Sequence, residues 1–144
     1  MQELRDKRER KKLEKGFTLM EIMVVLIIIS LIVGIIGPRI YKKLKQGRII
    51  TAKAQIQNLE AALMDFNADM GRFPTTEEGL NALVQNPGSD MWSGPYLSKK
   101  KVPKDPWGRD YIYACPGNHD TPYDLYSKGP DGQEGTDDDI CNWK

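Results

Sequence analysis

The sequence contains few of the residues on which catalysis and nucleotide binding depend. It has a single histidine, His119, which lies in the segment PGNHDTP with no serine or cysteine partner at a familiar spacing. It has no glycine-rich phosphate-binding loop and no ligand spacing typical of zinc. We therefore expect His119 to be a surface turn residue and the protein not to be an enzyme.

The chain also has no broad excess of positive charge outside its N-terminus. Residues 1–16 contain seven Lys and Arg against four Asp and Glu, whereas the remainder contains fourteen basic and sixteen acidic residues. A protein that binds nucleic acid usually presents an electropositive face to the phosphates. The composition therefore argues against nucleic acid as a partner.

Cysteine is scarce, and both copies lie in the C-terminal third, at Cys115 and Cys141. They follow the apolar segment described next, so they should lie on the same side of any membrane. A disulfide bridge between them is plausible if that side is oxidising. The alternative is a pair of unrelated buried thiols.

The segment KGFTLMEIMVVLIIISLIVGIIGP, residues 15–38, resembles a membrane span. Residues 22–37 carry no charge, and a start at Phe17 brings the segment to the roughly 20 residues that a spanning helix needs. The basic flank before it should stay in the cytoplasm and send the C-terminal domain across the membrane. Glu21 is the one charged residue near the start of this apolar segment. A charge within hydrocarbon costs roughly 2.5 to 3.5 kcal/mol, so its presence needs an explanation.

These residues resemble the class III signal of type IV pilins and pseudopilins, with Gly16 before the cleavage point, Phe17 after it and Glu21 fifth in the mature chain. An ordinary secretory signal is cut after its apolar run, not before it. The resemblance implies that a prepilin peptidase removes residues 1–16 and that Phe17 is N-methylated. The alternative is an uncleaved single-pass anchor.

Cleavage would also explain why Glu21 lies in the apolar segment. It would create an amine on Phe17 in the same apolar setting as the carboxylate of Glu21, and each charge is costly alone. We expect Phe17 of an incoming subunit to pair with Glu21 of its neighbour, which would offset both desolvation costs and set the axial register.

The apolar segment should continue into the folded domain as one helix over residues 17–70, whose first part, 17–37, spans the membrane. Pro38, with Gly34 and Gly37 nearby, predicts a kink or local melting that would let packed subunits extend. The basic cluster beyond it should lie at the water side of the interface: Arg39, Lys42, Lys43, Lys45 and Arg48. An apolar stripe then predicts packing against the domain, although a coiled-coil seam would show the same spacing: Ile49, Ala52, Ile56, Leu59, Leu63, Phe66 and Met70.

Residues 71–144 should form one small domain. GRFPTTEEGLNALVQNP predicts a short helix capped by Thr75 or Thr76 with Glu78 in its first turn, and its inward residues should be Leu80, Leu83 and Val84. YIYAC and YDLYS predict two strands, with a third possible at the end of the chain. The expected fold is α+β, in which the long helix packs on a small antiparallel sheet.

The last loop, SKGPDGQEGTDDDICNW, concentrates negative charge at Asp131, Asp137, Asp138 and Asp139. A hard cation with oxygen ligands, calcium above all, would neutralise these carboxylates, and the three glycines permit carbonyls to join them. The spacing is not that of an EF-hand. A solvated acidic turn is the alternative.

The segments FPTTEEGL, DPWG and DDDICNW resemble those of the major pseudopilin of type II secretion, so the likeness runs from Gly16 to Trp143. Major pseudopilins hold calcium in this loop. The resemblance implies as ligands the side chains of Asp131, Asp138 and Asp139 and the carbonyls of Lys128 and Thr136, with Asp137 outside the shell. Lys128 departs from the hydrophobic residue that is more usual there. A bridge between Cys115 and Cys141 would tie the loop end to the preceding strand.

The resemblance implies a structural subunit of the bacterial inner membrane that polymerises into a helical filament, the periplasmic pseudopilus of type II secretion. Its implied partners are further copies of itself, minor pseudopilins, the prepilin peptidase, and an inner-membrane assembly platform with a cytoplasmic ATPase. Two alternatives remain open at this point. One is a type IV pilin of a surface pilus, and the other is a membrane-anchored, calcium-binding monomer.

Overall fold

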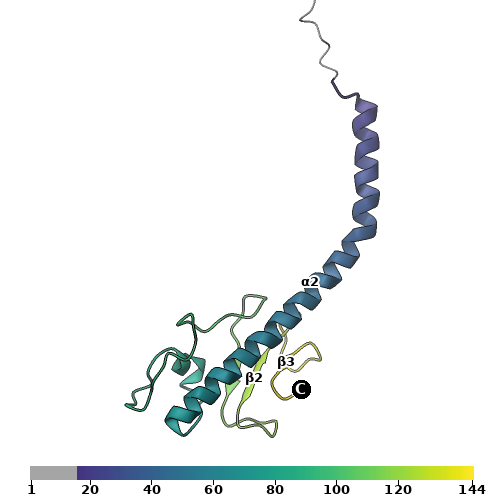
Figure 1. The fold of residues 1–144 in the computed structure, drawn as a ribbon. Helices are drawn as coiled ribbons and strands as arrows, with labels where there is room; N and C mark the ends of the chain where they lie inside the picture. The colour runs from purple at the N-terminus through teal and green to yellow at the C-terminus, as the bar shows by residue number, and fades with distance from the viewer. Residues whose placement is uncertain (1–15) are drawn as a thin grey trace, which may run out of the picture. The chain divides into compact units, whose positions relative to one another are not determined.

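The computed structural model describes residues 16–144, which form one long helix, a 3-10 helix and a three-stranded sheet (Figure 1). The elements are α2 (Leu19–Met70), η1 (Gly79–Leu83), β1 (Ile112–Ala114), β2 (Asp124–Ser127) and β3 (Ile140–Cys141). The chain divides after Tyr41 into two units, the second being Lys42–Lys144. Apart from Gly16, the leader expected at residues 1–16 lies outside the described residues.

The long helix begins at Leu19 rather than at Phe17. Thr18 caps it, because its Oγ1 accepts a hydrogen bond from the backbone N–H of Glu21 at 3.2 Å. This cap places Glu21 in the first turn, where the positive end of the helix dipole favours a carboxylate. The start of the helix therefore differs by two residues from the expected one.

Helix α2 runs through Pro38 without interruption, so the expectation of local melting there was wrong. Proline removes only one backbone hydrogen bond, the one to the carbonyl of Gly34, and its fixed φ angle is compatible with a helix. The hydrogen bonds on both sides of this position are sufficient to keep the chain helical.

The C-terminal half of α2 supplies one side of the core. The predicted stripe is confirmed except that Ile49 is only partly buried, and Ala62 joins it; the buried residues are Ala52, Ile56, Leu59, Ala62, Leu63, Phe66 and Met70. They pack on residues of the sheet and the loop before it: Tyr111, Tyr113, Tyr123, Leu125 and Ile140. The stripe is therefore core, as expected, and not a coiled-coil seam.

The segment after α2 forms a turn closed by two reciprocal hydrogen bonds. Thr75 Oγ1 accepts from the N–H of Glu78, and Glu78 Oε2 accepts from the N–H of Thr75. The helix that follows is a 3-10 helix of five residues, and its N-cap residue is Glu78, which makes no side-chain capping hydrogen bond. The expected cap by Thr75 or Thr76, with Glu78 in the first turn, was therefore wrong. The tighter turn of this 3-10 helix buries Ala82 together with Leu80 and Leu83, and it leaves Val84, which we expected inside, only half-buried.

The strands form a small antiparallel sheet, as predicted, which includes the third strand left open by the sequence and has the order β1-β2-β3. Ile112 pairs with Tyr126, and Tyr126 pairs with Cys141 on its other side. Ser127 and Ile140 are the last pair of β2 and β3, so the acidic loop at 128–139 connects these two strands. The register therefore holds both ends of that loop on the sheet.

The ion pair between Arg72 and Glu78 makes the stability of the fold dependent on pH. Arg72 donates two hydrogen bonds to Glu78, at 2.7 and 2.8 Å, and these lower the pKa of Glu78 from 4.5 to about 2. Because the pKa is depressed on folding, the pair stabilises the fold above pH 4.5 and this contribution is lost as the pH falls through 2. We predict that Glu78→Gln lowers the free energy of unfolding at pH 7 by about 1 kcal/mol.

The measurement is urea unfolding followed by tryptophan fluorescence, on the full chain in detergent micelles between pH 2 and 7. The matched control is Glu77→Gln, which should change stability little across the range. A destabilisation by Glu78→Gln that is as large at pH 2 as at pH 7 would contradict the assignment.

Candidate functional site

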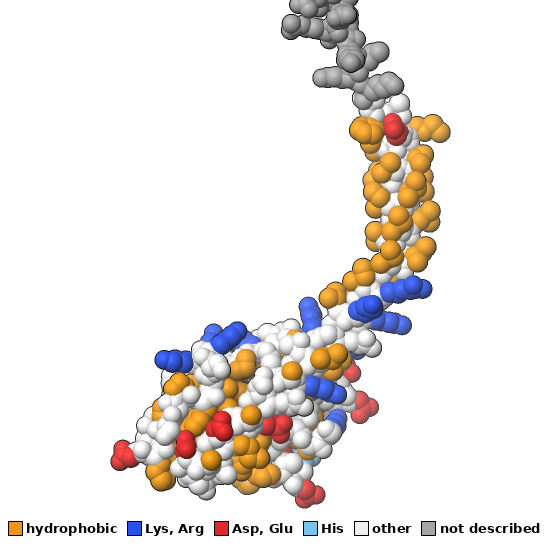
Figure 2. All heavy atoms as spheres, viewed as in Figure 1, with side chains coloured by type: hydrophobic (Ala, Val, Ile, Leu, Met, Phe, Trp, Pro, Cys, Tyr) orange, Lys and Arg blue, Asp and Glu red, His pale blue; other side chains and the backbone are white. Residues whose placement is uncertain are grey.

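The N-terminal part of α2 presents apolar side chains to its surroundings. Every residue from 19 to 36 is exposed, and the helix is long and apolar enough to cross a membrane (Figure 2). Basic side chains follow immediately along the helix (Figure 2). An apolar surface of this length, which no described part of the chain covers, is typical of a membrane anchor.

The predicted processing residues precede this helix. Gly16 and Phe17 lie outside any regular element, and the Phe17 side chain is 76% exposed. A peptide bond in such a segment is accessible to a protease, whereas a bond within a helix is not. Glu21 lies one turn into the helix, also exposed.

The predicted calcium ligands all belong to residues 128–139, the connection between β2 and β3. Asp139 Oδ2 accepts a hydrogen bond from the N–H of Gly135 at 2.7 Å. Asp131 Oδ1 accepts one from the N–H of Gln133 at 3.0 Å, and this bond lowers the pKa of Asp131. Asp138 Oδ2 lies 3.9 Å from Lys45 Nζ, at the surface of the same unit.

The second carboxylate oxygen of Asp139, Oδ1, differs from the first in its hydrogen bonding. Asp139 Oδ1 is buried, and it has no hydrogen-bond partner among the described residues. A buried carboxylate oxygen without a partner is costly, and a bound cation would satisfy it. The donor set is carboxylate and carbonyl oxygen, which calcium prefers, so the residues present fit this ion.

The carboxylate side chains of this loop are not grouped around one point. Within residues 16–144 no three His, Cys, Asp or Glu side chains are grouped closely enough to hold a metal. Carboxylates repel one another without a cation between them, which favours this open arrangement.

Sequence reasoning overlooked a buried polar network beneath this loop. Asp105 is 4% exposed and accepts a hydrogen bond from the hydroxyl of Ser127 at 2.7 Å. The guanidinium of Arg109 donates to the carbonyl of Gly129. Asp105 and Arg109 frame the DPWG segment, which sequence analysis singled out only for its resemblance, and nothing in the spacing of these residues indicates that they meet the loop.

The two cysteines are free thiols, and the structure does not bring them together. Cys141 is aligned with Ile112 across β2, so their backbones lie about 9.6 Å apart at the usual strand spacing. Cys115 lies three residues further along, beyond the roughly 7 Å Cα separation that a disulfide permits. The bridge considered from the sequence is therefore absent, and burial raises the pKa of Cys141.

His119 lies in the turn between β1 and β2, as expected, with its side chain 48% exposed. Its Nδ1 is 2.9 Å from Asp124 Oδ2, and its ring stacks on Trp143 at a centroid distance of 3.9 Å. The side chain and backbone of Asn142 also bond to β2. His119 therefore helps to hold the C-terminus against the sheet.

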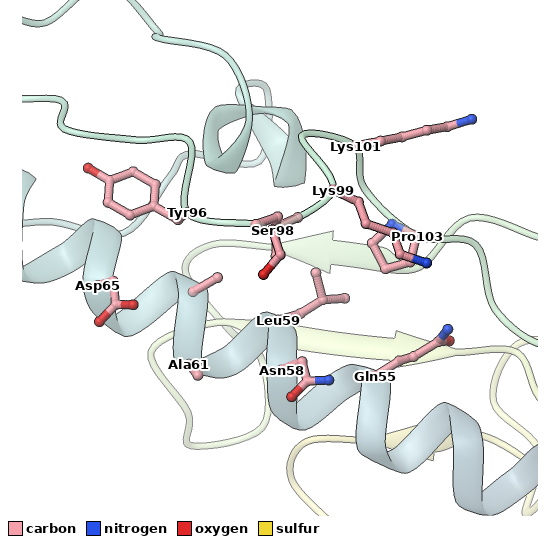
Figure 3. Close-up of a pocket in the computed structure, with 12 residues that line it drawn as sticks. Gln55, Asn58, Leu59, Ala61, Asp65, Tyr96, Ser98, Lys99, Lys101 and Pro103 are labelled. Carbon is pink, nitrogen blue, oxygen red and sulfur yellow. The ribbon is translucent and has the colours of Figure 1, made fainter.

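A groove of about 430 Å³ lies between α2 and the loop at 96–103 (Figure 3). Its lining includes one carboxylate, Asp65, and two lysines, Lys99 and Lys101. Figure 3 shows Lys101 extending away from the helix. This groove lacks the acidic donors of a cation site, and it is separate from the loop at 128–139.

The fold and the anchor together define a class. An exposed apolar N-terminal helix that continues into a domain as its spine, preceded by an accessible Gly16–Phe17 bond and carrying Glu21 in its first turn, is the architecture of a pseudopilin. Two family descriptions match the chain: "Prokaryotic N-terminal methylation motif" over residues 11–37 and "Type II secretion system (T2SS), protein G" over residues 39–143.

Curated relatives and a solved structure agree. The chain is 41% identical to type II secretion system core protein G of Escherichia coli strain K12, covering 90% of this chain and 91% of the relative. It is 40% identical to the protein of that name from Pseudomonas aeruginosa, covering 93% and 98%. It resembles the crystal structure of the major pseudopilin from the type 2 secretion system of enterohaemorrhagic E. coli, with a TM-score of 0.59 and 34% identity, covering 72% of this chain and 92% of that one. The chain belongs to the type II secretion system protein G family, which is a family of structural subunits.

Proposed function

We propose that this pseudopilin is stored in the bacterial inner membrane, is cut after Gly16, and then polymerises into a periplasmic pseudopilus that drives type II secretion. The observation that carries the proposal is the uncovered apolar surface of α2 next to a separately packed domain. In the membrane, lipid covers this surface. In a filament, the same surface of neighbouring copies replaces the lipid.

The location rests mainly on the methylation motif at the N-terminus, because the basic cluster at residues 39–48 on the far side of the span reduces the weight of the charge rule. The N-terminal flank carries a net charge of +3 and stays in the cytoplasm, where the positive-inside rule retains it. The domain from Lys42 onward then lies in the periplasm. The partners are further copies of the chain, minor pseudopilins, the prepilin peptidase, and an assembly platform whose cytoplasmic ATPase supplies the energy.

Assembly depends on a pair of charges. Cleavage frees the amine of Phe17 at the edge of the apolar segment, and Glu21 holds a carboxylate in the same segment. Neither charge is solvated well when helices pack together. The amine of one subunit therefore pairs with the carboxylate of its neighbour, and a subunit in the wrong register leaves both unpaired.

Processing can be tested by mass. In cells with the prepilin peptidase, the N-terminal peptide should begin at Phe17 and carry one added methyl group. In cells without the peptidase it should begin within residues 1–16 and lack that group. Peptide mass spectrometry checks both, and a stable protein that keeps its first 16 residues in peptidase-containing cells would favour the uncleaved anchor.

The charge pair can be tested by substitution. We expect Glu21→Gln to be cleaved normally and to remain in the membrane, because the change is far from the folded core. Filament formation, counted by electron microscopy of overproducing cells, should fall at least tenfold. The matched control is Ser30→Ala, a small change within the same apolar helix, which should leave the count unchanged. Assembly of Glu21→Gln at the normal rate would refute the pairing.

We further propose that calcium binds the loop at 128–139 as a structural ion. Asp131, Asp138 and Asp139 would hold it through side chains, and Lys128 and Thr136 through carbonyls. The support is the partnerless Asp139 Oδ1 and the density of oxygen donors between two paired strand ends. When bound, the ion neutralises the carboxylates and adds binding free energy to folding.

Chelation tests this proposal. Excess EGTA should lower the melting temperature of the full chain by about 5 °C or more, since saturating calcium contributes roughly 2 to 3 kcal/mol. Near-ultraviolet circular dichroism in detergent micelles measures the transition. Asp139→Asn should remove the sensitivity to EGTA, whereas Asp137→Asn, outside the ligand set, should keep it. An unchanged wild-type transition, with no calcium by elemental analysis, would refute the ion.

A further inference from the structure

The turn at residues 105–109 has no part in the membrane anchor or in the proposed ligand set, yet it contains the most buried carboxylate of the domain's loops. Asp105 Oδ1 accepts hydrogen bonds from the N–H groups of Trp107 and Arg109 at 3.0 and 2.8 Å. Its other oxygen accepts the hydroxyl hydrogen of Ser127. Asp105 therefore fixes its own turn to the last residue of β2.

Ser127 connects the turn of Asp105 to the start of the loop at 128–139 by hydrogen bonds. Its Oγ donates to Asp105 and accepts a hydrogen bond from the N–H of Gly129 at 3.2 Å. Ser127 is fully buried, so these bonds have no competition from water. The backbone that flanks the carbonyl of Lys128 is thus held on both sides.

Arg109 holds the same part of the loop from within. Its Nη2 donates to the carbonyl of Gly129, and its Nη1 occupies the space that a Cβ at Gly132 would fill, 2.1 Å from that position. Both glycines have positive φ angles, of 63° and 72°. Its Nε is buried without a hydrogen-bond partner among the described residues, 3.7 Å from Asp105 Oδ2.

The position of this guanidinium matters for charge as well as for shape. Two other cations of the described residues pair with carboxylates of the loop: Lys45 with Asp138 and Lys128 with Glu134. The Arg109 side chain differs from them because it donates to a backbone carbonyl of the loop. It lies where an acidic loop needs positive charge before any ion binds.

We propose that Asp105 and Arg109 are positioning residues for the loop at 128–139. They hold the backbone at Gly129 and Gly132, next to the Lys128 carbonyl and Asp131, so that mainly the carboxylate side chains have to move when the ion binds. The ion then has fewer residues to order on binding, so its affinity is higher. The affinity part of this inference rests on the proposed calcium site, and the ordering of the loop does not.

The test uses the full chain in detergent micelles, with calcium titrated by calorimetry and amide hydrogen exchange measured in EGTA. We expect Arg109→Met to weaken calcium binding at least tenfold, the scale found when partners of metal ligands are removed. In EGTA, amide exchange should rise at residues 129–135 and stay unchanged in β1. Arg109→Lys keeps the charge without the planar fork, so it should recover only part of the loss. The matched control is Lys104→Met, whose cation pairs with Asp110 at the surface.

A pair of glycine substitutions provides an independent variant. Gly132 and Gly88 both have positive φ angles, so alanine strains either backbone. At Gly132 the new Cβ would meet Arg109, whereas nothing lies within 4 Å of the one at Gly88, which is outside the loop at 128–139. Gly132→Ala should therefore reproduce the effects of Arg109→Met, and Gly88→Ala should not.

The outcomes separate the two proposals. Unchanged exchange at residues 129–135 in Arg109→Met would overturn the positioning role. So would equal calcium affinity in Arg109→Met and wild type, or equal effects of the two glycine variants. A wild-type chain that binds no calcium would overturn the ion site and the affinity claim, whereas the exchange measurement would still decide whether Arg109 orders the loop.

Discussion

An apolar helix surface that the folded domain leaves uncovered is the constraint on which this protein depends. The exposed residues from 19 to 36 need a non-aqueous environment, and two are available to the proposed subunit. One is the bilayer, and the other is the interior of a bundle formed by identical helices. The same helix, α2, contains this surface in its N-terminal part and the buried face of the domain in its C-terminal part.

The domain is built so that α2 also serves as its scaffold. Its buried face from Ala52 to Met70 covers the sheet, and the sheet in turn holds the ends of the acidic loop. The loop therefore has little core of its own. It is ordered by the strand pair at its base, by Arg109 from within and, in the proposed function, by an ion. In the proposed function, several independent contacts would keep the loops of the domain ordered while the subunit moves from the membrane into the filament.

The C-terminus is also held by several contacts. Asn142 bonds to β2, and Trp143 stacks on His119, so the last residues close over the turn between β1 and β2. The single histidine thus contacts Trp143 and Asp124 and contributes to the packing of the C-terminus.

The sequence by itself determined the elements whose signal is local. An uncharged run of apolar residues specifies a membrane helix, a three-and-four spacing specifies the buried face of α2, and short alternating segments specify β1 and β2. The contact between Thr75 and Glu78 was also predictable, because these residues are three apart, although it closes a turn before η1 rather than capping that helix. The helix type at Gly79–Leu83 was not, since the choice between α and 3-10 depended on how Ala82 and Leu83 meet the core.

Only the tertiary structure decided which distant residues meet. The strand order placed β2 between the segments of Cys115 and Cys141, which excluded their bridge, although their expected location on the same side of a membrane had made it plausible. Arg109 reaches Gly129 and Gly132 across 20 or more residues because β2 returns past the turn that holds Asp105. No periodicity records such a contact, because it arises from the register of the sheet and from the space that a missing Cβ leaves open.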